Sequence, residues 1–321
     1  MTIRNPVEWG VDQFKHAALA VETAGRVGRR TLDALHSPPP AVRRITLARL
    51  GDVLAKGIDD FAAFRTDVIF VCVFYPLAGL VLARLAFGYN LMHLVFPLTS
   101  GFALIGPFVA VGLNEMSRGR EAGREVRWTD AFAVVRSPSF GAIVLLGLLL
   151  MAIFLLWLAA AWGIYEVTLG PAPPASVGSF ARDVFTTNSG WIMIGAGIGV
   201  GFLFALLVLV ISVVSFPLLL EREAGVDTAI LTSARAVIAN PVPIAAWGLI
   251  VAGGLVLGSI PLFLGLIVVM PVLGHATWHL YRRAVEPNPG APPDLQPEPP
   301  GKRYAAEFPA SLFARSRDDV A

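Results

Sequence analysis

The chain has 321 residues, of which 55% are hydrophobic and only 15% are charged, with a formal net charge of +2. A soluble domain usually carries about a quarter of charged residues, so this composition excludes an ordinary soluble protein. The single cysteine, Cys72, excludes a disulfide framework and a metal cluster held by several thiolates.

The two ends of the chain differ in composition from the rest. Residues 1–40 are weakly amphipathic and basic, and they end at three consecutive prolines, Pro38, Pro39 and Pro40, which cannot continue a helix. We predict a cytoplasmic N-terminal extension here, either partly ordered or used as a helix on the membrane or on a partner. Residues 286–321 begin with a Pro-rich stretch and are predicted to form a disordered cytoplasmic tail.

Residues 41–285 are interpreted as a membrane domain. From 41 to 67, apolar residues recur at helical spacing with basic residues between them, which indicates a helix lying in the membrane interface. From 68 onward the chain consists mainly of apolar runs longer than the roughly 20 residues that a helix needs to cross a bilayer. These lengths fit helices and exceed the roughly ten residues of a barrel strand, so we expect an all-α membrane protein.

Two of the apolar runs are about twice the length of one span, so each must fold back on itself. The turns are placed at Gly88-Tyr89-Asn90 and at residues 258–261. This gives six transmembrane helices, at about 68–86, 91–113, 140–165, 191–220, 241–258 and 262–281.

The basic residues predict the orientation. With both termini in the cytoplasm, all 25 Lys and Arg residues except Arg84 and Arg182 lie in cytoplasmic segments. This strong positive-inside bias favours a topology with cytoplasmic N and C termini. Similar short motifs before the first, third and fifth spans indicate three units, each an interfacial helix followed by a transmembrane hairpin.

His275 and His279 lie four residues apart, so both imidazoles occupy one face of the predicted sixth span. A haem or metal site needs such a pair, but no carboxylate or cysteine follows at matching spacing. Trp278 and Tyr281 beside them are typical of an aromatic belt. Structural hydrogen bonding and ligation both stay open, and we expect the structural role, with no metal or other cofactor.

Glu115 with Arg118 and Glu221 with Arg222 lie at predicted cytoplasmic exits of spans. They are interpreted either as interfacial anchors, paired within a helix turn, or as a ring of polar groups around a cytoplasmic vestibule. Arg84 lies near the external end of the first span and can extend its side chain outward.

The predicted fourth span contains a run of small residues in which Gly195, Gly197, Gly199 and Gly201 form two overlapping GxxxG patterns. Small residues allow close approach of helix backbones in lipid, so this face is predicted to pack against another helix, within the chain or in a dimer.

Four separated stretches occur in order: FPLTSGFALIGPFVAVGLNEMSRGREAG, SVVSFPLLLERE, TSARAVIANP and PVLGHATWHLYR. Together they resemble a bacterial family of integral membrane proteins classed as a domain of unknown function. Some of its members carry the name cytochrome c oxidase subunit I. The resemblance covers about residues 43–286 and implies a six-helix inner-membrane protein with no established activity.

The oxidase name does not fit the histidines of this chain. A haem–copper core needs histidine ligands on several helices, whereas only five histidines occur here. His16 and His36 precede the membrane domain, and His93 is predicted at the face opposite to His275 and His279. Any connection with an oxidase would therefore concern assembly or accessory contacts.

No nucleotide-binding, metalloprotease or Ser/His/Asp motif occurs, so no catalytic residue is expected and an enzyme is disfavoured. The expected partners are the lipid bilayer, anionic lipid at the cytoplasmic face and another membrane protein, with no nucleic acid. Two classes of function stay open: a non-catalytic scaffold or assembly component of a membrane complex, and a transporter or channel for a small solute. A haem or metal protein using His275 and His279 is a third, less favoured alternative.

Overall fold

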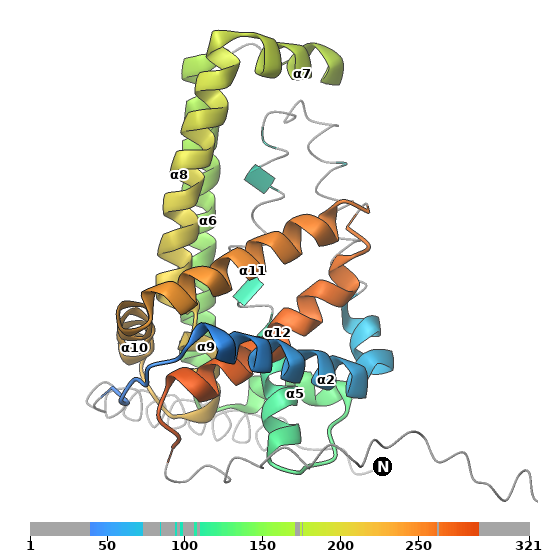
Figure 1. Ribbon diagram of the computed structural model, residues 1–321, viewed down its shortest axis with the longest axis vertical. Coiled ribbons are helices and arrows are strands. Elements are labelled where there is room, and N and C mark those ends of the chain that lie inside the picture. The colour runs from blue at the N-terminus through green and yellow to red at the C-terminus, as the bar shows by residue number, and fades with distance from the viewer. Residues whose placement is uncertain are drawn as a thin grey trace, which may run out of the picture. The chain divides into compact units, whose positions relative to one another are not determined.

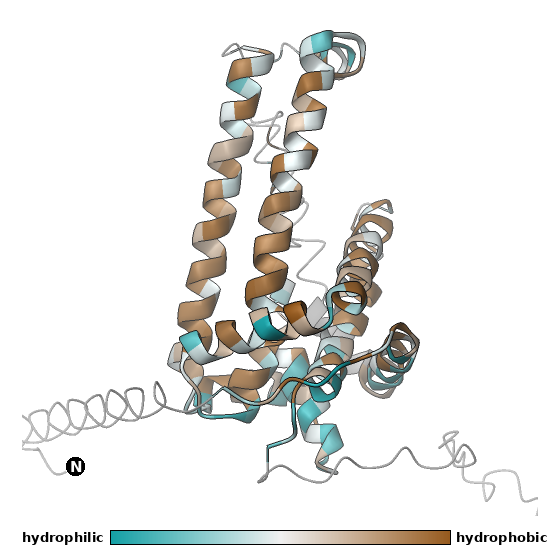
Figure 2. Cartoon of the chain, turned by 60° about the vertical axis from the view of Figure 1, so that its left-hand side comes forward, coloured by the Kyte–Doolittle hydropathy of each residue, from teal (hydrophilic) through white to brown (hydrophobic). Residues whose placement is uncertain are grey.

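Two long apolar helices, α6 (Phe140–Thr168) and α8 (Asn188–Ser212), lie side by side in the computed structural model (Figure 1). Helix α8 begins where the hydroxyl of Thr187 accepts a hydrogen bond of 3.0 Å from the backbone N–H of Gly190, which caps the first turn. Both helices are hydrophobic along most of their length, as Figure 2 shows. Since a helix satisfies its own backbone hydrogen bonds, such segments can lie in lipid.

The described residues form helices, turns and one isolated β-bridge, and contain no strand. They all lie in the first of two compact units, residues 1–291. The prediction of an all-α fold is therefore confirmed for this part of the chain. The structure describes residues 39–72, 84, 94, 97–98, 106–107, 110–170, 174, 176–261 and 263–288.

Three helical segments are long and apolar enough to cross a membrane: α6, α8 together with α9 (Ser215–Glu221), and α11 (Pro241–Ser259). They correspond to the third, fourth and fifth predicted spans. Helix α12 (Leu266–Ala284) covers most of the predicted sixth span but is not one of the three, because two histidines and two arginines lower the hydropathy of its second half. The predicted first and second spans, the N-terminal extension and the C-terminal tail lie largely outside the described residues.

Several other elements pack near one end of α6 and α8 and carry most of the described charges. We call this region the charged base. It also includes α9 and the second half of α12, and its remaining elements are α2 (Leu47–Cys72), α5 (Val111–Glu121), the 3-10 helix η2 (Trp128–Arg136) and α10 (Val226–Ala239). The predicted interfacial segment of residues 41–67 thus forms most of α2.

Helix α2 packs closely along α12. At their contact, a Cβ added to Gly57 would lie 2.6 Å from the Cβ of Ala276 and 2.7 Å from the carbonyl oxygen of Val272. Only glycine leaves room for this approach. Trp278 and Tyr281, both 1% exposed, are among the largest fully buried side chains of the surrounding core.

The residues just before α2 pair with the residues just after α12. Val42 and Val285 form an antiparallel bridge, and the backbone N–H of Arg43 donates to the carbonyl oxygen of Ala284 over 2.8 Å. Asn240, between α10 and α11, donates from Nδ2 to the carbonyl oxygen of Arg43 over 3.0 Å. These bonds join the two ends of the segment 41–285, which was predicted to be one domain.

The segment between α6 and α8, predicted as a Pro-rich loop, contains a helix of its own, α7 (Val177–Thr186). The side chain of Ser176 accepts a hydrogen bond of 3.1 Å from the backbone N–H of Ser179, which caps the first turn of this helix. A serine three residues before another small polar residue is the sequence signal that could have predicted α7.

The glycine run of α8 has one close neighbour among the described residues. A Cβ added to Gly201 would lie 3.1 Å from the indole of Trp157 on α6, whereas no described residue lies within 4 Å of one added to Gly195, Gly197 or Gly199. The packing role of the whole run stays a prediction.

Candidate functional site

A buried cluster of polar side chains joins α2, α5 and α12 in the charged base. Its centre is Asp60 of α2, which is 4% exposed. One carboxylate oxygen of Asp60 accepts from Ser117 Oγ over 2.6 Å and from His279 Nε2 over 2.8 Å. The other oxygen accepts from the guanidinium of Arg120. Three helices that are distant in the sequence are thus joined through one carboxylate.

The environment of Asp60 stabilises its charged form. Burial by itself raises the pKa of a carboxyl group, because a charge is poorly solvated there. The hydrogen bond and charge of His279, with the hydrogen bond from Ser117, outweigh this effect and lower the pKa of Asp60 from 3.8 to about 2. Asp60 is therefore an ionised acceptor at neutral pH.

His275 extends the cluster further into the core. Its Nδ1 lies 2.8 Å from Ser117 Oγ, and since Ser117 gives its only proton to Asp60, Nδ1 must donate. The ring is 0% exposed, its centroid lies 5.9 Å from that of Phe64, and its Nε2 is buried without a hydrogen-bond partner among the described residues. His275 thus supplies one hydrogen bond and one unused nitrogen.

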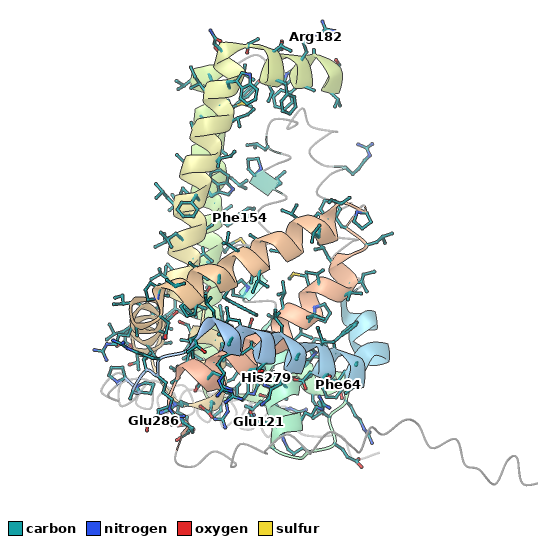
Figure 3. All side chains as sticks on the ribbon, viewed as in Figure 1. Phe64, Glu121, Phe154, Arg182, His279 and Glu286 are labelled. Carbon is teal, nitrogen blue, oxygen red and sulfur yellow. The ribbon has the colours of Figure 1, made fainter. Side chains whose placement is uncertain are left out.

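This geometry positions helices and does not present a reactive group. Ser117 is 1% exposed and both its neighbours occupy its oxygen, so no substrate can reach it as a nucleophile. Within the described part of the chain, no group of three His, Cys, Asp or Glu side chains is placed to hold a metal ion. Figure 3 shows His279 and Phe64 within the packed elements of the charged base.

A second network lies toward the end of α12. Trp278 Nε1 donates to Glu121 over 2.7 Å, so the aromatic residue predicted for a membrane belt is buried against α5 instead. Arg282 bridges two carboxylates, donating to Glu121 over 3.0 Å and to Glu221 over 2.8 Å. Tyr281 also donates to Glu221. These bonds connect α12 to both α5 and α9.

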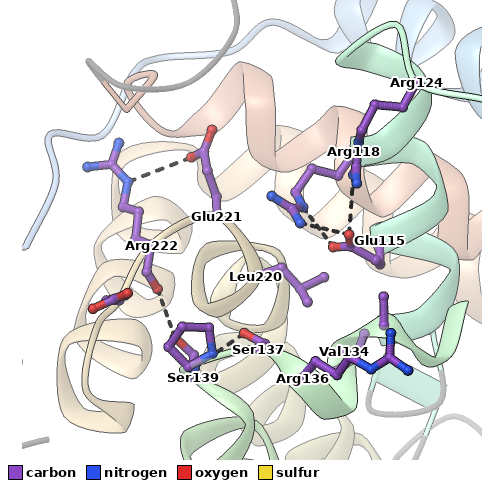
Figure 4. Close-up of a pocket in the computed structure, with 13 residues that line it drawn as sticks. Glu115, Arg118, Arg124, Val134, Arg136, Ser137, Ser139, Leu220, Glu221 and Arg222 are labelled. Atoms are coloured by element: carbon purple, nitrogen blue, oxygen red, sulfur yellow. Dashed lines mark hydrogen bonds and ion pairs between the residues drawn. The ribbon is translucent and has the colours of Figure 1, made fainter. Parts of the chain in front are cut away.

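The four charged residues predicted at the cytoplasmic exits line a single pocket of about 360 Å³. Arg118 Nε and Nη2 donate to the two oxygens of Glu115, each over 2.7 Å, and these bonds raise the pKa of Arg118. Glu221 and Arg222 form the opposite side of the pocket, with 3.7 Å between their charged groups. Figure 4 shows that Arg118 and Arg124 both point toward Glu115.

Residues 95–221 match a family described as predicted integral membrane protein, DUF2189. The chain is similar to this family over that segment. The matched segment spans α5 to α9 and so includes Glu115, Arg118 and Glu221, while Arg222 follows it directly. Asp60, His275 and His279 lie outside it. No curated protein and no solved structure matches the chain.

The remaining predicted site residue, Arg84, is exposed and belongs to neither network. The described residues include no ion pair between it and Glu166 or Asp183. Asp60, Ser117 and Arg120 were not predicted as site residues, because Asp60 lies on α2 and the other two lie on α5, far away in the sequence. The one available signal was that Asp60 interrupts the apolar face of an amphipathic segment.

Proposed function

We propose that this protein is a non-catalytic scaffold or assembly component of the bacterial inner membrane, with six spans and both termini in the cytoplasm. The observation that carries the proposal is the separation of charge from the spans. In the three candidate spans the only charged residues are Glu166 and Glu221, both near a helix end. Ion-coupled carriers usually need ionisable groups at mid-membrane depth.

The bonding of the charged base also supports a structural role. Its buried carboxylates, those of Asp60, Glu115 and Glu221, each accept hydrogen bonds from at least two groups. A buried carboxylate held by several donors is costly to rearrange. Transport requires alternating arrangements of such groups, whereas a fixed platform for another protein does not.

The surface of the charged base supports contact with membrane or protein. Exposed apolar side chains occur on η2 and α10, neither of which belongs to a candidate span: Val135 is 59% exposed, Leu231 45% and Ile238 78%. We propose that these residues face lipid or another membrane protein, and that the arginines beside them face anionic lipid on the cytoplasmic side.

Co-purification tests the scaffold role. The tagged full chain, extracted in mild detergent, should retain a membrane-protein partner at fixed stoichiometry, measured by quantitative mass spectrometry. Leu231→Asp with Ile238→Asp should release that partner, because both side chains lie on one face of α10. Val177→Asp with Phe185→Asp, at exposed apolar positions of α7 outside the charged base, is the matched control and should retain it.

Reconstitution tests the alternative. Purified protein in liposomes loaded with a pH-sensitive or ion-sensitive dye should cause no flux above that of empty liposomes. Solute or ion flux from the pure protein, abolished by substitutions in the pocket, would establish the transporter class and overturn the scaffold proposal.

A further inference from the structure

The pocket in the charged base carries more positive groups than its own carboxylates use. Four arginines line it, namely Arg118, Arg124, Arg136 and Arg222, together with the glutamates at positions 115, 221 and 223. Two of the three glutamates are largely buried, with side chains 5% exposed at Glu115 and 7% at Glu221. Whether the pocket attracts an anion depends on which charges are already paired.

The two buried carboxylates are saturated by short bonds. Glu115 is held by both nitrogens of Arg118, with Arg124 at 3.4 Å from the same carboxylate. Glu221 is held by Arg282 from outside the pocket and by Tyr281. Bidentate and charge-assisted bonds of this kind leave little acceptor capacity on either group.

Donor capacity is left over on the arginines. Arg136 forms no ion pair within the described residues and is exposed at the pocket, and the side chain of Arg124 is 55% exposed. Arg222 is less available, because its buried Nε lies 3.7 Å from Glu221 and its Nη2 donates to the carbonyl oxygen of Glu286. Glutamate 223, the third acidic residue, is exposed to solvent. The accessible part of the pocket therefore offers several N–H donors and a local excess of positive charge.

The residues just before α6 also line the pocket. Ser137 and Ser139 line the pocket directly before the first helical residue, Phe140. The Ser139 hydroxyl does not cap the helix and instead donates to the carbonyl oxygen of Arg222 over 3.1 Å. The N–H of Ser139 donates to Ser137 Oγ over 3.2 Å and that of Phe140 to the carbonyl oxygen of Ser137 over 3.0 Å. The contribution of this helix start is therefore the positive potential of the helix dipole, added to that of the arginines.

We propose that this pocket binds a phosphate-bearing anion through Arg124 and Arg136. The planar guanidinium fork matches the geometry of phosphate oxygens, and two forks at one pocket favour phosphate over a monovalent inorganic anion. Two sources present this chemistry, an anionic lipid headgroup and a free phosphate. The lipid source rests on the proposed membrane placement, because the apolar helix α6 begins at Phe140, directly after the pocket residue Ser139.

Binding to the purified full chain tests the proposal in detergent, where it does not depend on topology or on any protein partner. The probes are inorganic phosphate, phosphatidylglycerol and, as a lipid without net charge, phosphatidylcholine. Affinity is measured by calorimetry for phosphate and by native mass spectrometry for the lipids. We expect saturable binding of phosphate or phosphatidylglycerol, and at least tenfold weaker binding of phosphatidylcholine.

The variant Arg124→Gln with Arg136→Gln should weaken this binding about tenfold or more, since neither arginine supplies the main support of a buried carboxylate. The matched control, Arg44→Gln with Arg235→Gln, removes the same charge from exposed positions outside the pocket and should bind as the unmodified protein does. Should the double variant not fold, Arg136→Gln alone gives the comparison, since this side chain is exposed and unpaired.

Each outcome of these measurements either supports or overturns the proposed anion site. Loss in the pocket variant alone supports the site, and the preferred probe identifies its source: tighter phosphatidylglycerol indicates a lipid headgroup, and equal or tighter inorganic phosphate indicates a free phosphate. Equal loss in the two double variants would show a diffuse surface charge effect and overturn the pocket. Absence of binding to every probe overturns it as well, and leaves the scaffold proposal untouched.

Discussion

His279 on α12 donates a hydrogen bond of 2.8 Å to Asp60 on α2, across a separation of 219 positions in the sequence. The same carboxylate oxygen accepts from Ser117 of α5. A buried carboxylate bonded in this way contributes to the fold mainly through the cost of removing its partners, because an unpaired buried charge is poorly solvated. The bonds from His279 and Ser117 to Asp60 therefore make the packing of three helices mutually dependent.

Asp60→Asn should lower the free energy of unfolding by roughly 2–4 kcal/mol, because the amide leaves Arg120 and His279 without a charged acceptor. Unfolding in detergent, followed by tryptophan fluorescence, measures this. Asp59→Asn is the matched control, since Asp59 is the exposed neighbour on the same helix, and it should change stability by less than about 0.5 kcal/mol. Equal effects of both substitutions would mean that the cluster contributes nothing specific.

We expect the stability of the fold to depend on pH through the same carboxylate. The folded pKa of Asp60, about 2, lies below its unfolded value of 3.8. The resulting stabilisation is fully present above pH 3.8 and is lost as the pH falls toward 2, amounting to about 2 kcal/mol. Stability measured between pH 5 and pH 2 should fall more steeply for the unmodified protein than for Asp60→Asn. Parallel curves would contradict the assignment.

Replacement of His275 by glutamine should lower the stability less than replacement by leucine. Gln can donate a hydrogen bond to Ser117 from a similar position, whereas Leu leaves this buried oxygen without that donor, at a cost of about 1–3 kcal/mol. Thermal unfolding of the two variants measures the difference. The unmodified protein should show no Soret absorbance and no stoichiometric transition metal. Bound haem or metal that both variants lose would establish ligation instead.

The sequence predicts the local features of this fold well and its long-range contacts poorly. Apolar length identifies α6, α8 and α11, because lipid requires each span to satisfy its own backbone. The spacing of His275 and His279 correctly places both on one face of α12. Their partners Ser117 and Asp60, however, come from other helices, and no local pattern encodes a contact between such distant positions.

The pocket illustrates the same limit. The pairs Glu115 with Arg118 and Glu221 with Arg222 are visible in the sequence, and a polar ring was one of two interpretations for them. These four residues share one pocket with Arg136 because of the way α5, η2 and α9 pack. Charge patterning alone does not predict that packing. The packing predicted for the glycine run of α8 stays a prediction, since GxxxG spacing permits close packing but does not require it, and Gly201 alone has a described neighbour within 4 Å.

Topology is tested with reporter fusions. Fusions after Asn90, Pro174 and Ser259 should report the periplasm, and fusions after residues 123, 225 and 287 should report the cytoplasm, because nearly all basic residues lie on the second set of segments. Activity of paired periplasmic and cytoplasmic reporters measures each site. Two or more reversed positions would rule out the six-span arrangement and, with it, the cytoplasmic placement of the charged base.

Gly57 and Gly197 should respond in opposite ways to alanine. A methyl group at Gly57 would lie 2.6 Å from the Cβ of Ala276, so α2 and α12 must move apart, and we expect a loss of about 1–3 kcal/mol. At Gly197 no described atom lies within 4 Å of the added carbon, so Gly197→Ala should leave stability unchanged or raise it slightly through better helix propensity. Thermal unfolding in detergent compares them. A larger loss at Gly197 would show that this face of α8 is packed after all, whereas tolerance at both positions would show that α2 and α12 can separate without cost to the cluster around Asp60.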